Sequence, residues 1–321
     1  MLSNGPAKLT TLLVSYNTES LLDPCLEALD AALVKVQPNK VIAVDNASRD
    51  ASVAKLERDH PRVRLIKSDS NVGFGRANNL ALPYIDSPFI LLLNTDAFVP
   101  ENALDGPLDY MATHPECGIL GVKLIGRDGV LQPSCRYFPT PLNLFAGRTG
   151  LLRGAAGRMV DDMDWDHASL RECDWVPGCY YLVRREVVEQ VGLFDPRYFL
   201  YFEEVDHCMS AKRAGWKVVY YPDVSVVHIG GESAKSVGAL SNSGRQLEAL
   251  QTESAMLFFR KSRGLAGVLS FVALDLLADL LLLGNGIRRR RGSDSHRGLL
   301  SHMRRTIKIA FRTRLGRVPT R

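Results

Sequence analysis

The chain has 321 residues, 46% of them hydrophobic and 23% charged, a globular composition that excludes disordered, collagen-like and disulfide-scaffold proteins. Its net charge of +5 is unevenly spread, because residues 260–321 carry 15 Lys/Arg against 3 Asp/Glu, a net of +12, which leaves −7 for residues 1–259. A basic tail on an acidic body indicates a polyanionic partner, either anionic lipid or nucleic acid. Six cysteines without zinc-like spacing, and no visible secretory signal, favour a reducing cytosolic compartment.

Apolar runs alternate with helical periodicity in the first hundred residues. The pattern predicts strands at 9–15, 40–44, 63–67 and 89–93, with helices at 18–36, from Ser48 to about 59, and after the glycine-containing segment 71–79. Such alternation is typical of a parallel sheet with right-handed crossovers. We therefore expect an α/β fold with a Rossmann-like, mainly parallel central sheet and flanking helices.

Polar side chains follow three of these predicted strands. They are Tyr16-Asn17, Asp45-Asn46 and Asn94-Thr95-Asp96, at the carboxyl ends of the first, second and fourth strands. Each group alone is also typical of a turn. Parallel topology brings the three to one edge of the sheet, where open α/β sheets bind ligands, so we expect a polar ligand there. The segment 71–79 matches neither the dinucleotide fingerprint nor the Walker loop.

The elements are less regular beyond residue 101. We expect a helix at 102–113, strands at 118–125, 130–138 and 175–183, a helix at 185–191, a helix from 203 to 214, and a strand pair at 217–221 and 225–227. Residues 149–168 lack periodicity and are expected to form a lid or a linker. A Pro/Gly-containing loop is expected from the end of the strand at 130–138 through Gly157.

Two further groups of residues are candidates for catalysis or metal binding. Glu203, Glu204 and Asp206 crowd three carboxylates into four positions, which raises a pKa unless a cation or a catalytic role offsets the repulsion. The alternative is an acidic first helical turn favoured by the helix dipole. His228 ends an apolar strand before two glycines, and is either a core histidine or a metal ligand.

The tail contains a predicted helix at 241–260 and an apolar stretch at 265–287, followed by four arginines at 288–291. The stretch is long enough to cross a bilayer, but Asp275 and Asp279 oppose this. We expect a helix lying in the membrane interface or packed in an oligomer, with a packed core helix as the alternative. Nucleic-acid binding is disfavoured because no recognition motif is present. The expected domains are 1–237 and a helical, basic region at 238–321.

Taken together, the segments resemble the family-2 glycosyltransferases with the GT-A fold, and within them the bacterial rhamnosyltransferase-like branch. The resemblance covers roughly residues 8–235. It rests on Val14-Ser15-Tyr16-Asn17, Val44-Asp45-Asn46-Ala47-Ser48, Asn71-Val72-Gly73-Phe74-Gly75, Leu93-Asn94-Thr95-Asp96, Gly178, Gly192-Leu193-Phe194-Asp195, Tyr201-Phe202-Glu203-Glu204-Val205-Asp206 and Val227-His228. Each motif is weak alone, and their order and spacing are specific.

The resemblance implies a role for each matching position. Donor-binding residues would be Ser15, Tyr16, Asn17, Asp45, Asn46, Asn71, Gly73, Phe74, Asn78, Asn94, Thr95 and Asp96. Asp96 and His228 would bind a divalent cation, Mg²⁺ or Mn²⁺, since Asn94 replaces the first acid of the family's Asp-x-Asp motif. Glu204 would be the catalytic base, with Asp206 and then Glu203 as alternatives. Trp175, Gly178 and Tyr201 would contact the acceptor.

The resemblance also implies an inverting, metal-dependent hexosyltransferase of cell-wall or surface polysaccharide biosynthesis. The expected donor is dTDP-β-L-rhamnose and the expected acceptor a lipid-linked or polysaccharide glycan, with the enzyme peripheral on the inner face of the plasma membrane. UDP-galactofuranose or UDP-GlcNAc is the alternative donor. A sugar nucleotidyltransferase is disfavoured because Ser15-Tyr16-Asn17-Thr18 is not its basic, glycine-rich loop. A non-catalytic nucleotide-sugar-binding scaffold would not need Asp96, Glu204 and His228 together.

Overall fold

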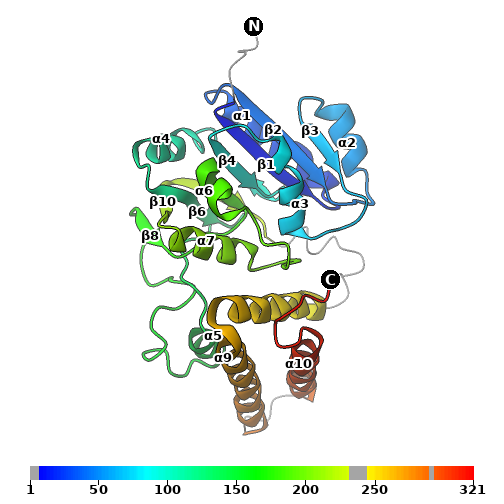
Figure 1. The fold of residues 1–321 in the computed structure, drawn as a ribbon, viewed down its shortest axis with the longest axis vertical. Coiled ribbons are helices and arrows are strands. Elements are labelled where there is room, and N and C mark those ends of the chain that lie inside the picture. Colours follow the sequence, from blue (N-terminus) through cyan, green and yellow to red (C-terminus); the bar gives the residue numbers. More distant parts are fainter. Residues whose placement is uncertain (1–6, 231–243, 289–292) are drawn as a thin grey trace. The chain divides into compact units, whose positions relative to one another are not determined.

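The computed structural model describes residues 7–230, 244–288 and 293–321, and these form two compact units (Figure 1). Of the described residues, the first unit contains 7–136, 163–196 and 203–230, whereas the second contains 137–162, 197–202 and the C-terminal helices. Several predicted features lie outside the described residues. They are the boundary between residues 237 and 238, Gly231, the helix start at 241–243, and Arg289 to Arg291.

The first unit is built on one sheet. Its strands are β1 (Leu9–Ser15), β2 (Asn39–Asp45), β3 (Arg64–Lys67), β4 (Phe89–Leu93), β5 (Ala97–Phe98), β6 (Cys117–Ile125), β7 (Leu131–Gln132), β8 (Arg171–Cys173), β9 (Tyr180–Arg184) and β10 (Lys217–His228). The order is β3-β2-β1-β4-β9-β6-β10-β5, with β7 beside β6 and β8 beside β10. The first four strands lie where the apolar runs predict them, and β1 and β4 have the predicted bounds.

The sheet is mixed. Its part formed by β3, β2, β1 and β4 is parallel, as predicted, whereas β5, β7, β8 and β9 pair antiparallel with their neighbours. β1 pairs in parallel with β2 and β4, and β2 with β3. β9 is antiparallel to both β4 and β6, so β6 again runs in the direction of β4, and β10 is parallel to β6. The carboxyl ends of β1, β2 and β4 therefore meet at one edge, which is where the polar residues follow them.

Helices cover both faces of this sheet. They are α1 (Glu19–Leu33), α2 (Ser52–Asp59), α3 (Phe74–Leu80), α4 (Asp105–Thr113), α6 (Arg185–Val191) and α7 (Glu203–Arg213). On one face, Leu22, Leu56 and Met111 of α1, α2 and α4 join alternate strand residues in a continuous buried core. Side chains alternate along a strand, so Tyr181 points to the opposite face, where its hydroxyl contacts His207 of α7 at 2.7 Å.

Three sequence predictions between residues 130 and 227 are wrong. The predicted pair 217–221 and 225–227 is one strand, β10, whose register against β6 shifts between Tyr221 and Ser225. The strand expected at 130–138 is reduced to β7 and an isolated bridge from Arg136 to Trp175. The expected loop through Gly157 contains a helix, α5 (Pro141–Thr149). Thr140 begins α5 with a capping box, and Gly150 ends it in the left-handed conformation.

The second unit is helical. α9 (Gly244–Arg288) consists of two helical segments joined at a kink at Gly264, whose φ of 68° is non-helical. α10 (Ser293–Arg312) follows. Among the described residues, one helix, Gln246–Gly286, is long and apolar enough to cross a membrane. Of its most apolar part, 33% is buried within the protein.

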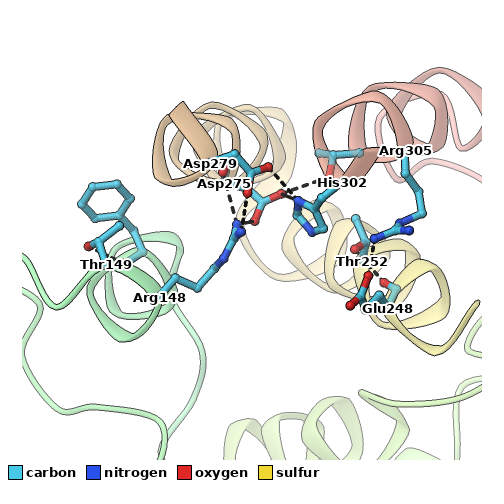
Figure 2. A network of polar contacts seen from close by, with 10 residues as sticks. Arg148, Thr149, Glu248, Thr252, Asp275, Asp279, His302 and Arg305 are labelled. Atoms are coloured by element: carbon cyan, nitrogen blue, oxygen red, sulfur yellow. Dashed lines mark hydrogen bonds and ion pairs between the residues drawn. The ribbon is translucent and has the colours of Figure 1, made fainter. Parts of the chain in front are cut away.

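The two aspartates of the apolar stretch are paired inside this unit (Figure 2). Arg148 of α5 binds Asp275 and Asp279, with 2.5 Å to the Asp279 carboxylate. From α10, His302 lies 2.7 Å from Asp279, and Thr306 donates a hydrogen bond to Asp275. His302 and Arg148 keep the pKa of Asp279 below its usual value although burial raises it. The group ties α5, α9 and α10 together.

Breaking this network is expected to destabilise the second unit. Asp279 is fully buried, so Arg148→Ala leaves a buried carboxylate without the guanidinium that binds it. The expected loss is about 2–4 kcal/mol of unfolding free energy, the lower part of the range for buried pairs because Arg148 is itself partly exposed. Urea denaturation followed by circular dichroism at 222 nm, the usual helix signal, measures it. Arg153→Ala, at an exposed position, is the control, and equal midpoints for both variants would contradict the prediction.

Candidate active site

The ends of β1 and β2 are joined by a network of short hydrogen bonds. The backbone amide of Asn17 donates to Ser48 at 2.9 Å, and that of Arg49 donates to the Asn17 side chain at 2.7 Å. Ser48 in turn donates its amide hydrogen to Asp45 Oδ2 at 3.0 Å. Asp45 is 2% exposed, and no described residue forms a hydrogen bond with its Oδ1. A buried acceptor without a donor fits a ligand hydroxyl, such as that of a ribose.

The segment after β3 is held by its asparagines. Asn46 donates to Asn71 at 3.0 Å and accepts from the amide of Val72, while Asn71 also accepts from Gly73. Gly73 has φ 90°, a conformation that a side chain would strain. Asn78 is buried and bonds to the Phe74 carbonyl within α3. The structure therefore brings the predicted donor residues of 46 and 71–78 together, with their amides organising the loop.

Asp96 and His228 face each other at the predicted edge. Ala97 pairs with His228 across β5 and β10, and the amide of Ile229 donates to the Asp96 carbonyl. Asp96 Oδ1 lies 3.5 Å from His228 Nε2, and Oδ1 is buried without a hydrogen bond from any described residue. An oxygen and a nitrogen at this separation are spaced as two ligands of one cation would be. The pair fits a divalent cation.

Gln132, which the sequence analysis did not identify, contacts the imidazole of His228. Its Oε1 lies 3.0 Å from His228 Nδ1, and its Nε2 donates to the His228 carbonyl at 2.9 Å. This assigns the hydrogen to Nδ1 and turns Nε2 toward Asp96, the arrangement of a histidine ready to bind metal. Burial opposes protonation of His228, but Asp96 and Cys179 outweigh it and raise the pKa to about 10. A bound cation would replace that proton.

Gln132→Leu is expected to weaken Mn²⁺ binding about 10- to 100-fold, since partners of metal ligands typically contribute this much. Leucine removes the bond to Nδ1 while keeping most of the volume. Calorimetric titration of Mn²⁺ in the presence of a nucleoside diphosphate measures the change. Gln190→Leu, which loses only a surface bond to Trp216, is the matched control. An unchanged Mn²⁺ affinity in Gln132→Leu would contradict the proposed role of Gln132 in orienting His228.

The three acids begin α7. Glu203 and Asp206 are 3% and 4% exposed, whereas Glu204 is only partly buried. Burial raises the pKa of Glu204, and its own amide, the charge of Arg136 and the amide of Gly178 oppose the rise. No described residue bonds to Glu204 Oε2. Of the three, Glu204 is the least buried, which favours it over Glu203 and Asp206 for taking a proton from a bound acceptor.

Residues 178 and 179 connect Glu204 with Asp96 and His228. Gly178 contacts Glu204 through its amide, as above, and the next carbonyl, that of Cys179, accepts a hydrogen bond from the Asn94 amide at 3.1 Å. The Cys179 side chain interacts with His228. Gly178 and Cys179, two consecutive residues, thus connect Glu204, the Asn94–Asp96 turn and His228.

The three predicted acceptor residues, Gly178, Trp175 and Tyr201, lie in different surroundings. Gly178 lies against Phe74, since a Cβ built on it would be 3.5 Å from that ring. Trp175 is 5% exposed, with the Arg136 guanidinium 4.2 Å from its ring centroid, so it supports Arg136. Tyr201 has a φ of 70° and belongs to the segment 197–202 of the second unit. Ser15 is buried and bonds to Thr18, and Thr95 is buried with no described partner for its hydroxyl.

Comparison with known proteins gives consistent results. Residues 10–148 match the family model of glycosyl transferase family 2. The chain is 30% identical over 240 residues to the N-acetylglucosaminyl-diphospho-decaprenol L-rhamnosyltransferase of Mycobacterium tuberculosis strain H37Rv, covering 68% of this chain and 75% of that one. It is 25% identical to the rhamnosyltransferase WbbL of Escherichia coli K12, covering 68% and 81%.

Solved structures share the fold. The mannosyltransferase PcManGT of Pyrobaculum calidifontis, in complex with GDP-Man and Mn²⁺, has a TM-score of 0.56 at 15% identity and covers 96% of this chain and 87% of that one. Residues 1–349 of Staphylococcus aureus TarS, in complex with UDP, give 0.52 at 15% identity, with 96% and 92% covered. The predicted GT-A fold, with its C-terminal helical extension, is confirmed.

Proposed function

The chain belongs to glycosyl transferase family 2, in its rhamnosyltransferase-like branch, and from this premise we propose that it transfers L-rhamnose from dTDP-β-L-rhamnose to a lipid-linked or polysaccharide acceptor. Its being a glycosyltransferase of cell-wall or glycan biosynthesis follows from the family itself. The names of two relatives support the finer statement. Both are rhamnosyltransferases, and one acts on a sugar carried by a diphospho-decaprenol lipid.

The observation that supports the site most directly is the buried Asp96 Oδ1, which accepts no hydrogen bond from a described residue and lies 3.5 Å from His228 Nε2. We propose that this pair holds Mg²⁺ or Mn²⁺. When bound, the cation neutralises the charge that develops on the leaving diphosphate. The unbonded Oδ1 of Asp45 and the loop of Asn46, Asn71 and Gly73 are proposed to bind the nucleoside at the same sheet edge.

Glu204 is proposed as the base. As the acceptor hydroxyl oxygen bonds to the anomeric carbon, its proton passes to the Glu204 carboxylate, and the bond from that carbon to the diphosphate oxygen breaks on the opposite side. The product is therefore an inverted α-L-rhamnoside. Holding donor and acceptor in line supplies much of the rate enhancement.

The lipid-linked acceptor fits the charge distribution. We propose that residues 1–237 act as the glycosyltransferase domain and 238–321 as a membrane-surface or oligomerisation region, peripheral on the inner face of the plasma membrane. Fifteen Lys/Arg from residue 260 onward would attract anionic headgroups.

Donor screening tests the proposal. The purified protein with Mg²⁺ or Mn²⁺ is incubated with dTDP-rhamnose, UDP-galactofuranose, UDP-GlcNAc or GDP-mannose, and release of the nucleoside diphosphate is measured with and without a polyprenyl-diphospho-GlcNAc acceptor. Acceptor-dependent release from dTDP-rhamnose is expected. Preference for a UDP-sugar would replace the rhamnose proposal with its alternative, and turnover that survives EDTA would contradict the cation.

A further inference from the structure

We propose that the exposed face of α10 is a docking surface for an anionic lipid bilayer. This deepens the proposed function, on which it rests, by assigning membrane contact to one helix face. The predicted contact was the apolar stretch at 265–287, whose two aspartates are instead paired within the second unit.

The helix is two-sided. Thr306, Ile309 and Ala310 are buried, and so is Thr313 just beyond its end. At about 100° per residue, the opposite side carries two adjacent strips. The apolar strip consists of Leu300, Ile307 and Phe311, which are 42%, 42% and 81% exposed. The basic strip consists of Arg297, Arg304, Lys308 and Arg312, all exposed.

The basic strip is unneutralised by the described residues, none of which forms an ion pair with its four cations. By contrast, Arg305, on the flank toward α9, is bound to Glu248 (Figure 2). Unpaired cations on one helix face attract a polyanion, and their spacing along successive turns spreads the charge over a surface.

The apolar strip selects the bilayer among polyanions. Leaving Phe311 and Ile307 in water costs free energy that insertion at the level of the headgroups recovers. Nucleic acid would pair with the cations but would gain little from Leu300 and Ile307. Exposed leucines also occur on α9, at 265, 269, 277 and 280, but residues 264–287 contain no Lys or Arg beside them. On α9, Lys261 and Arg263 are exposed just before Leu265, but a strip of four cations alongside exposed apolar side chains is found on α10.

Vesicle co-sedimentation of the full-length protein tests the surface. Binding is expected to vesicles of phosphatidylcholine with phosphatidylglycerol and not to phosphatidylcholine alone at the same salt concentration. The double variants Arg304→Glu/Lys308→Glu and Ile307→Ser/Phe311→Ser are each expected to weaken binding by at least about tenfold. Lys8→Glu/Val34→Ser, an exposed basic and an exposed apolar position of the first unit, is the matched control and should bind as the unaltered protein does.

Several outcomes separate the alternatives. Thermal unfolding should be unchanged in every variant, because all four α10 positions are exposed. Equal vesicle binding by both α10 variants and the control would overturn the proposal. Binding to a short RNA, lost in the charge variant, kept in the apolar variant and unaccompanied by vesicle binding, would assign the face to nucleic acid. Vesicle binding as expected, in a protein that turns over no donor, would retain the docking surface and reject the proposed function.

Discussion

Glu204→Gln is expected to lower kcat by about 10²- to 10⁴-fold while leaving nucleotide-sugar binding within about twofold. Glutamine has the size of glutamate and can still accept hydrogen bonds from the backbone amides of residue 204 and Gly178. It cannot take up the proton of the acceptor hydroxyl. Single-turnover transfer, with donor affinity measured by calorimetry, separates the two quantities. Loss of donor binding in this variant would remove Glu204 from the role of base.

The stability of this variant provides an independent check. Burial raises the folded-state pKa of Glu204 above its unfolded value. The ionised carboxylate therefore destabilises the fold above that pKa, and the penalty disappears as the pH falls and the group is protonated. Glu204→Gln should thus unfold at an equal or higher temperature at neutral pH. For the same reason, the apparent pKa of the acidic limb in the pH profile of kcat/KM should lie above the ordinary range for a carboxylate. Glu204→Gln should lack this limb.

The other two acids are the matched controls. Glu203 and Asp206 are buried, so their substitution by Gln and Asn should alter α7 and its N-terminus more than proton transfer. We expect these variants to lose stability and to keep the acidic limb of the pH profile. If Asp206→Asn removes the limb while Glu204→Gln retains it, Asp206 is the base.

Local patterns predict the part of the fold that local physics determines. Leu9 to Ser15 and Phe89 to Leu93 are buried on both faces, so continuous apolar runs mark them, and the parallel connections require the polar edge. The antiparallel insertion of β9 between β4 and β6 depends on pairing between residues far apart in sequence, which no single run contains. The helix α5 is short, and its signal was the capping box at Thr140 with Pro141 rather than hydrophobic periodicity.

The candidate site follows the same division. Asp96 and His228 are recognisable because Asp96 lies in the turn that follows the buried strand β4, and His228 is the last residue of β10 before the glycines. Gln132 lies on the two-residue strand β7 beside β6, and its side chain reaches His228 at the end of β10. Similarly, Arg136 affects Glu204 from an isolated bridge. Residues that orient others depend on tertiary contacts, and their own sequence surroundings do not distinguish them.

Asp96→Asn is expected to lower kcat/KM by about 10²- to 10³-fold and to raise the Mn²⁺ concentration needed for half-maximal activity. Asn94 supplies no charge, so the carboxylate of Asp96 is the only anionic protein ligand that the Asn94–Asp96 turn offers. Removing it leaves His228 and the donor diphosphate to hold the cation. Manganese titrations with and without a nucleoside diphosphate measure the change in affinity directly.

Asn94→Asp is the complementary variant, because it adds a second carboxylate at a partly exposed position of the same turn. It should tighten Mn²⁺ binding in the absence of donor, whereas the unaltered protein should bind Mn²⁺ weakly until the diphosphate contributes its oxygens. Asp96→Asn and Asn94→Asp thus change the metal affinity in opposite directions through charges two residues apart. A Mn²⁺ response that neither variant alters would mean that the cation does not bind at Asp96, and the unbonded Oδ1 would then need a different partner, such as a sugar hydroxyl of the donor.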